Sequence, residues 1–365
     1  MEFQEQTISF KQVREGYQIE NDELGICAAI TNPGTVNTLL SNPYLEDENR
    51  TMYILERIDG MVRGRAMLFP SKMLVQGNII PSSAGSGLLV EKNARKYALG
   101  LSLLMYGVKH KEYQHLLYAG LSKMVVPIYK KLKFSLFSTP LMWQPRKTKF
   151  VFQRAGFSKV FVDLFSNLAN LILKPYLWIG KQACAKSANE YIIKQHLIIP
   201  QWVDDITLKD THKYAEYHDH KWMQWVVDNT FSEDPRSSRR FYAVYSKEDK
   251  PLAFFLIKEN YGALPERHID DICFGAIIEW GLMPGAMLDE YTLTKIATLS
   301  FSPEVDIVEF TSDNNMVISK MKKYGFFQHG EVHICFKDLT KELDKDSQKI
   351  DNWRIRLGYS DVAFY

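Results

Sequence analysis

Residues 94–107, ARKYALGLSLLMYG, place two cations and several small residues directly before a run of leucines. The leucines predict a helix that begins at about Arg95. The first N–H groups of a helix lack internal partners and the helix dipole adds positive charge there, so this end can hold an anion. Arg95 and Lys96 add charge, while Ala98 and Gly100 leave room for a phosphate near the backbone. The segment therefore predicts a phosphate-binding site.

Strand-forming runs must position this segment. Residues 52–60 and 62–70 are apolar and β-favouring on either side of Asp59-Gly60, a dipeptide typical of hairpin turns. Further along we expect strands at 73–80, 85–92 and 115–121, and helices at 95–109 and 127–134.

The second half repeats this order. A hairpin at 239–258, a strand at 276–285, a helix at 287–301, a strand at 306–312 and a helix at 314–327 follow one another. The pattern predicts a mixed α/β fold with two copies of one unit. We expect a first domain at 1–150, a helical connector at 151–195 and a second domain at 196–365.

Two segments resemble motifs of the GNAT superfamily of N-acetyltransferases. Arg95-Lys-Tyr-Ala98-Leu-Gly100 resembles the family's pyrophosphate-binding pattern Gln/Arg-x-x-Gly-x-Gly/Ala, with alanine at the first glycine. Ala98 fits that position if the backbone there is helical. PIYKKLKF, at 127–134, is similar to the family motif LYeklGF, with Lys133 in place of glycine. Tyr129 then falls where the family has a tyrosine that protonates the departing thiolate of coenzyme A.

The resemblance implies a tandem acyltransferase that uses acetyl-CoA as co-substrate. It would move an acetyl or short acyl group to a primary amine of a small molecule by direct attack in a ternary complex. In this fold the strand at 85–92 parts from the strand at 115–121, and free backbone groups around Leu88 to Val90 pair with the pantetheine arm. An N–H near Leu89 or Val90 would hold the oxyanion. The implied cofactor-binding residues are Leu88, Leu89, Val90, Arg95, Lys96, Ala98, Leu99 and Gly100.

The general base is less clearly marked. Glu56 on a strand and Glu91 beside the cofactor segment are candidate general bases, and with Tyr129 they form the predicted catalytic set. His115, which starts the neighbouring strand, is weighed as a base beside them. In the second half Met321 stands at the position that matches Tyr129, and methionine has no proton to donate. The second copy is therefore expected to be degenerate and to support the first.

Two other functions stay open. Residues 92–154 hold thirteen Lys or Arg and one acid, Glu112, so a Fem-like transferase that uses charged tRNA is an alternative. Replacement of family residues by Ala98, Lys133 and Met321 is also what a non-catalytic binding module would show. DNA is not an expected partner, and the sequence leaves the oligomeric state open.

Composition and spacing limit the remaining possibilities. The four cysteines have no zinc-ligand spacing, and His212, His218 and His220 are better explained as exposed or aromatic-face residues of a helix, so no metal is expected. The N-terminal residues lack the basic start and apolar stretch of an export signal, which predicts a cytoplasmic protein.

Residues 157–180 are rich in apolar side chains but are interrupted by polar ones, so no membrane span is expected. We expect this segment to be a helix packed between the domains, with contact to a bilayer as the less favoured alternative. The aromatic tail at 351–365 must pack against some part of the fold that the sequence does not identify.

Overall fold

The computed structural model describes residues 2–232, 234–264 and 269–364. Its first half contains β1 (Phe3–Ser9), α1 (Phe10–Arg14), α2 (Ala28–Thr31), α3 (Pro33–Leu40), β2 (Thr51–Ile58), β3 (Met61–Val75), β4 (Asn78–Val90), η1 (Lys92–Tyr97), α4 (Leu99–His110), β5 (His115–Ala119), α5 (Val126–Lys131) and β6 (Ser135–Pro145). The elements α6 (Lys149–Arg154) and α7 (Lys159–Ala188) follow.

The second half contains β7 (Ile192–His196), α8 (Val203–Leu208), β8 (Tyr214–Glu216), α9 (His220–Asp228), β9 (Ser238–Tyr245), β10 (Pro251–Leu264), β11 (Ile269–Leu282), α10 (Glu290–Leu299), β12 (Ile307–Phe310), α11 (Asn315–Met321), η3 (Lys322–Tyr324) and β13 (Phe327–Asp338). Three short 3₁₀ turns complete the tail: η4 (Lys345–Gln348), η5 (Ile350–Asn352) and η6 (Ser360–Ala363).

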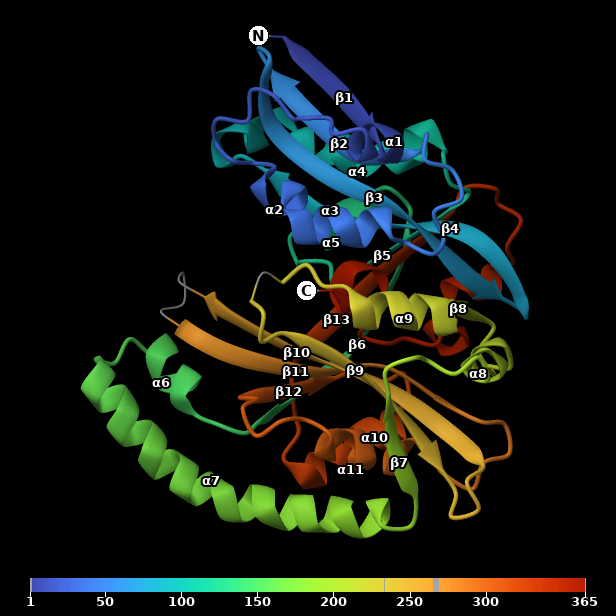
Figure 1. Cartoon of the computed structure of the whole chain (residues 1–365). Helices are drawn as coiled ribbons and strands as arrows, with labels where there is room; N and C mark the ends of the chain where they lie inside the picture. The colour runs from blue at the N-terminus through green and yellow to red at the C-terminus, as the bar shows by residue number, and fades with distance from the viewer. Residues whose placement is uncertain (1, 233, 265–268, 365) are drawn as a thin grey trace.

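The strands form one mixed sheet that runs through both halves (Figure 1). Its order is β1-β2-β3-β4-β5-β13-β6-β12-β11-β10-β9-β7, and β8 pairs with β3. Among the described strands only β4–β5 and β11–β12 pair in parallel, and each parallel pair is linked by one helix, α4 or α10. The expected repeat is therefore present as two copies of the same strand and helix order.

The last strand of each half lies in the other half's sheet. β13, from the second half, pairs with β5 of the first, and β6, from the first half, pairs with β12 of the second. The two exchanged strands also pair with each other. As a result the sheet is continuous, and residues 135–145 are shared with the unit that the sequence assigned to the second domain.

One expected strand is in fact a turn. The sequence predicted a single strand over 73–80, but β3 and β4 form a hairpin that turns at Gln76-Gly77, where both residues have positive φ. The Asp59-Gly60 turn lies where it was expected, between β2 and β3, with φ of 50° and 82°. Both are two-residue turns whose left-handed backbone suits the twist of a hairpin.

The tail packs between the two halves (Figure 1). Trp353 and Tyr359 are fully buried, and Trp353 contacts the rings of Phe137, Phe336 and Tyr214. A backbone hydrogen bond from Gly358 N to Ile278 O fixes the segment on β11. The aromatic tail thus forms part of the core that joins the halves.

The prediction that residues 157–180 pack between the domains is wrong. The helix α7 runs along the outer edge of the second half, and most of its large apolar side chains are exposed (Figure 1). No helix within the described residues is long and apolar enough to cross a membrane. The expected connector also ends differently, because residues 192–196 form β7 and pair with β9.

Candidate functional site

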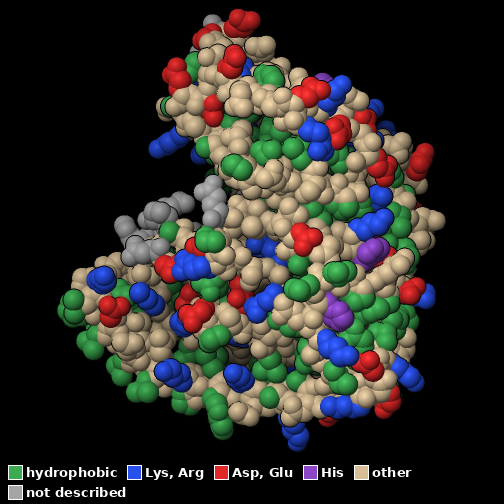
Figure 2. All heavy atoms as spheres, in the orientation of Figure 1, with side chains coloured by type: hydrophobic (Ala, Val, Ile, Leu, Met, Phe, Trp, Pro, Cys, Tyr) green, Lys and Arg blue, Asp and Glu red, His purple; other side chains and the backbone are tan. Residues whose placement is uncertain are grey.

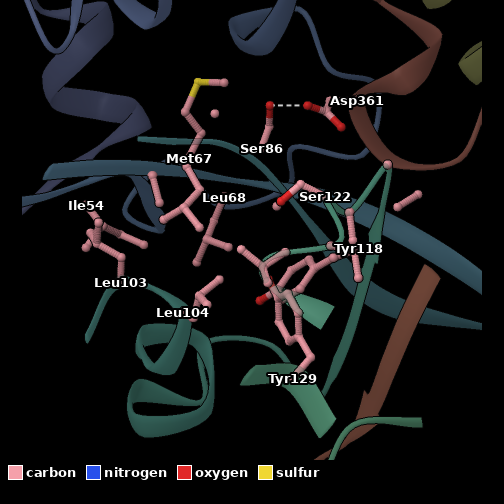
Figure 3. A pocket seen from close by; sticks show the side chains of 18 of the residues that line it. Ile54, Met67, Leu68, Ser86, Leu103, Leu104, Tyr118, Ser122, Tyr129 and Asp361 are labelled. Atoms are coloured by element: carbon pink, nitrogen blue, oxygen red, sulfur yellow. Dashed lines mark hydrogen bonds between the residues drawn. The ribbon is translucent and has the colours of Figure 1, made fainter. Parts of the chain in front are cut away.

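A cavity opens where β4 and β5 part. The two strands are paired only at Ser83↔Leu116 and Ala84↔Leu117, since both chains twist and then diverge. Beyond that point a cavity of about 580 Å³ lies between residues 85–88 and residues 118–122 (Figure 3). This size is typical of a site for a small organic ligand.

A β-bulge shapes the β4 wall of the cavity. In the register of β3 and β4, Ala66 faces both Gly87 and Leu88, so β4 carries one extra residue there. Gly87 has a φ of 61°, and a Cβ on it would lie 2.6 Å from Nη1 of Arg65. The Arg65 guanidinium donates hydrogen bonds to the carbonyls of Gly87 and Ile26. The bulge is thereby fixed with backbone groups turned out of the regular ladder.

The cavity has a largely apolar wall on the side of α4. Aliphatic side chains from β2, β3 and α4 form it, and the labelled ones in Figure 3 are Ile54, Leu68, Leu103 and Leu104. Met67 reaches the cavity from the opposite face of β3, because successive residues of a strand point to opposite faces. Such a wall suits a hydrocarbon chain.

Tyr129, a predicted catalytic residue, does line the cavity. It lies on α5, and its ring packs on those of Tyr118 and Phe134 at centroid distances of 5.7 and 4.9 Å. Burial raises the pKa of Tyr129 well above its ordinary value. The hydroxyl therefore stays protonated at neutral pH and acts as a donor.

Asp361, from the tail, supplies a carboxylate to the same cavity. It lies on η6, and the Ser86 hydroxyl on β4 donates a hydrogen bond to it (Figure 3). The turn is held in place by Lys258 Nζ, which donates to the carbonyl of Val362, and by Ser360 Oγ, which donates to Gly85 O. Desolvation raises the pKa of Asp361 to about 6. A carboxylate with that pKa can take up a proton near neutral pH.

The sequence did not single out Asp361 or Ser86. Ser86 belongs to the segment Gly85-Ser86-Gly87. Gly85 lets the Tyr118 ring pack directly on the backbone, since a Cβ on Gly85 would lie 2.7 Å from that ring. Asp361 is an acid within a mostly aromatic and apolar tail, which is a signal for a buried carboxylate once the tail is known to be core.

Of the three strand residues that were predicted to bind the cofactor, only one lines the cavity. Leu88 lines it, whereas Leu89 and Val90 do not. Leu89 is exposed, and Val90 packs against Gly64 and Gly100.

The predicted phosphate segment departs from a simple helix start. Residues 92–97 form the 3₁₀ turn η1, and α4 begins at Leu99 rather than at Arg95. Ala98 lies between them with a φ of 60°, so the expectation of a helical backbone there is wrong. At this left-handed position a glycine costs less than an alanine. Lys133, at the second missing glycine, has a φ of 59°, and Gly325 at the matching position of the second copy has a φ of 84°, so both residues have a left-handed backbone.

The side chains of the phosphate segment are mostly exposed. Arg95 donates from Nε to Val90 O at 3.3 Å, Lys96 lies over the Tyr97 ring, and both face solvent. Leu99, the first residue of α4, is buried, and Gly100 lies in the first turn of the same helix. The segment therefore offers two cations and a helix N-terminus at the end of β4, close in the chain to the cavity.

The other candidate bases lie elsewhere. Glu56 is buried on β2 outside the cavity lining, and desolvation raises its pKa. Glu91 forms an ion pair with Arg63, with 3.0 Å between Oε2 and Nη1. His115 is buried at the opposite end of β5 from the cavity, and its Nδ1 is 3.1 Å from Pro81 O.

In the second half, the N-terminus of α10 corresponds to that of α4, and a side chain of the protein itself occupies it. Asp289 accepts a hydrogen bond from Thr292 N at 2.7 Å, so a carboxylate already caps the N-terminus of α10. Met321, the last residue of α11, is fully buried in the core of the second half.

The three histidines were expected to be exposed and aromatic-face residues of a helix, but of the three only His220 lies in a helix, α9, and for His218 exposure is also wrong. His218 is fully buried, stacks on Trp222 at 3.5 Å, and contacts Glu279. Among the described residues no group of three or more His, Cys, Asp or Glu is arranged to hold a metal ion.

Comparison with solved structures decides the fold. The chain is similar to Saccharomyces cerevisiae N-myristoyltransferase with bound myristoyl-CoA, with a TM-score of 0.57 and 13% identity over 92% of this chain and 82% of that one. A GCN5-related N-acetyltransferase from Anabaena variabilis is also similar to it, with a TM-score of 0.54 and 9% identity over 93% of this chain and 73% of that one. The chain has a tandem GNAT-like fold. Comparisons with descriptions of protein families and with curated proteins find no match.

Proposed function

We propose that the protein is a coenzyme A-dependent N-acyltransferase whose active site is the cavity between β4 and β5. The observation that carries the proposal is the cavity at the parting of these strands in a GNAT-like fold, with Asp361 and Tyr129 both on its wall. The pantetheine arm of the acyl donor would lie along residues 85–88, and Arg95, Lys96 and the N-terminus of α4 would hold its pyrophosphate.

The reaction is a direct transfer within a ternary complex. The nitrogen of a primary amine attacks the thioester carbon, the C–N bond forms, and the C–S bond breaks. Asp361 takes the proton that the amine releases. Backbone N–H groups at the Gly87–Leu88 bulge stabilise the oxyanion, and the Tyr129 hydroxyl donates a hydrogen bond to the departing sulfur. Because the pKa of Tyr129 is raised, its task is hydrogen-bond donation, with the proton on the thiolate supplied in the end by solvent or by Asp361.

The acyl group need not stop at acetyl. The aliphatic wall made by Ile54, Leu68, Leu103 and Leu104 exceeds what two carbons can cover, and it favours donors with a longer chain. Each additional buried CH₂ is worth about 0.8 kcal/mol, so affinity for the donor should rise with chain length until the wall ends. The acceptor in this proposal remains a small-molecule primary amine.

The first experiment is calorimetric titration of the purified protein with acetyl-CoA and with acyl-CoA esters of increasing length. We expect one equivalent to bind, and affinity to grow by about three- to fourfold for each CH₂ over the first members of the series. Absence of binding to every ester, in a protein shown to be folded, would overturn the proposal and favour charged tRNA or a non-catalytic module.

A further inference from the structure

The helix α7 has an apolar face that the rest of the protein leaves uncovered. Within residues 159–188 the large apolar side chains recur at intervals of three and four, which places them on one face of the helix. In an ordinary surface helix this face packs on the core. Here it points to solvent: Val160 is 76% exposed, Ile172 74% and Trp178 62%. The other exposed members of this face are Phe161, Leu164, Leu168, Leu171 and Ile179.

The opposite face of α7 is firmly docked, so the orientation of the helix is set. Val162, Ser166 and Cys184 are buried against the second half. Asn170 Oδ1 accepts hydrogen bonds from N and Oγ1 of Thr148 at 3.0 Å, and Lys295 Nζ donates to Ser187 Oγ. The apolar side chains therefore cannot turn inward without breaking these contacts.

The charges beside the apolar face are almost all positive. The helix carries Lys159, Lys174, Lys181 and Lys186 against one acid, Asp163. These lysines are exposed, and within the described part of the chain none forms an ion pair. Figure 2 shows hydrophobic side chains along the lower-left edge of the molecule, the path that α7 follows in Figure 1, with basic side chains beside them.

We propose that α7 lies on the surface of a bilayer that contains anionic lipids. An apolar face flanked by lysines, with Tyr176 and Trp178 exposed in the second half of the helix, has the composition of helices that lie in the membrane interface. The helix is roughly 45 Å long at about 1.5 Å per residue. It lies along the surface because only one of its faces is apolar, the other is docked on the protein, and it is not apolar enough to cross a membrane. This inference rests on α7 alone and is independent of the proposed acyl transfer.

The charge pattern argues against a second copy of the chain on the same face. A two-fold interface brings the same patch of both molecules together, so the net positive charge of one helix, four lysines against one acid, would face the same net charge on the other. The two net charges repel each other, whereas lipid phosphates attract the lysines.

A cavity of about 370 Å³ beneath the helix adds to the argument. Trp178 and Lys181 border it, together with Arg146 from the end of β6. The Arg146 guanidinium donates to the carbonyl of Thr298 and, within the described residues, pairs with no carboxylate. An aromatic side chain and two cations around a hollow next to an apolar face suit an anionic headgroup.

Vesicle co-sedimentation of the full chain tests the proposal. We expect binding to vesicles of phosphatidylcholine with phosphatidylglycerol, and much weaker binding to phosphatidylcholine alone. The double variant Leu164→Asp/Leu171→Asp should bind at least tenfold more weakly, because two apolar groups that would insert into the bilayer become charges. Lys174→Glu/Lys181→Glu should bind at least tenfold more weakly to the anionic vesicles only. Ile79→Asp, an exposed apolar residue on the β3–β4 hairpin, is the matched control and should bind as the unchanged protein does.

A spectroscopic measurement separates docking from loss of fold. Brominated lipids should quench part of the tryptophan emission, and Trp178→Phe should remove that part. Failure of the folded protein to sediment with any vesicle would overturn the proposal. Equal binding by the α7 variants would also overturn it, and so would a dimer that the Leu164→Asp/Leu171→Asp change dissociates, because the face would then be an interface between copies.

Discussion

Asp361 is suited to its proposed role by its surroundings, because desolvation raises its pKa to about 6. If it is the base, kcat/KM should fall as the pH drops through about 6, since the protonated acid cannot accept a proton. Asp361→Asn should lower turnover by roughly 10²-fold or more at pH 8. A pH–rate profile of the unchanged protein and turnover of the variant provide the check. Full activity of the variant would remove Asp361 from the reaction.

The same substitution should not weaken the fold above pH 6. The folded-state pKa lies above the ordinary value of 3.8, so ionisation of Asp361 opposes folding progressively between about pH 4 and 6 and fully above 6. Asp361→Asn should therefore be as stable as the unchanged protein at pH 4 and more stable at pH 8, by up to about 3 kcal/mol. Urea unfolding at the two pH values separates this effect from a structural one.

Tyr129 and Tyr118 share the cavity wall and offer a matched pair. Tyr129→Phe should lower turnover about 100-fold with donor affinity largely kept, because the ring packing survives and only the hydroxyl is lost. Tyr118→Phe, whose hydroxyl lies over Gly107, should change turnover much less. Equal effects from the two changes would count against a special role for Tyr129, and loss of donor binding without a rate effect would mark Tyr129 as a contact residue.

Ala98 has a left-handed backbone that an alanine side chain opposes. Ala98→Gly should raise the free energy of unfolding by about 1 kcal/mol, because the relief of steric strain exceeds the entropy that glycine loses on folding. Denaturant midpoints measure the change. A lower midpoint for the glycine variant would show that the Ala98 methyl group makes packing contacts that outweigh the strain.

At the scale of elements, the start of α4 tests where the donor's phosphates lie. Arg95→Glu should weaken binding of coenzyme A by more than about 2 kcal/mol, since an attraction becomes a repulsion at a helix N-terminus. Lys111→Glu reverses a charge just past the opposite end of the same helix and should leave affinity nearly unchanged. Calorimetry on both variants gives the comparison, and unchanged affinity in Arg95→Glu would place the pyrophosphate elsewhere.

The sequence predicted elements well where local patterns govern them and failed where distant contacts do. Apolar runs on either side of Asp59-Gly60 predicted the first hairpin correctly. The start of α4 was predicted at Arg95, four residues before the observed start at Leu99. Gln76-Gly77 was missed because apolar residues flank it on both sides and hide the turn. Asp361 could not be placed from sequence, since 275 residues separate it from its partner Ser86. The exposure of α7 could not be predicted either, because an apolar face in the sequence pattern does not indicate whether that face packs on the core or points to solvent.

The whole molecule is joined by the exchange of β6 and β13, and this predicts that neither half folds alone. A fragment that ends at residue 147 would leave the β5 edge and both edges of β6 unpaired, and unpaired edges promote aggregation. We expect fragments 1–147 and 148–365 to be insoluble apart and to form a soluble complex when produced together. Circular dichroism and size-exclusion chromatography would reveal this. A stable, monomeric first fragment would contradict it.

The exchange also sets the order of events during synthesis. β6 ends at residue 145 and β13 at residue 338, so 193 further residues must be made before the first half's sheet can close. At about 5–20 residues per second the ribosome needs roughly 10–40 s for this stretch. Throughout that interval the nascent chain carries the open β5 edge beside the cavity, and an open edge of this kind can pair with other chains.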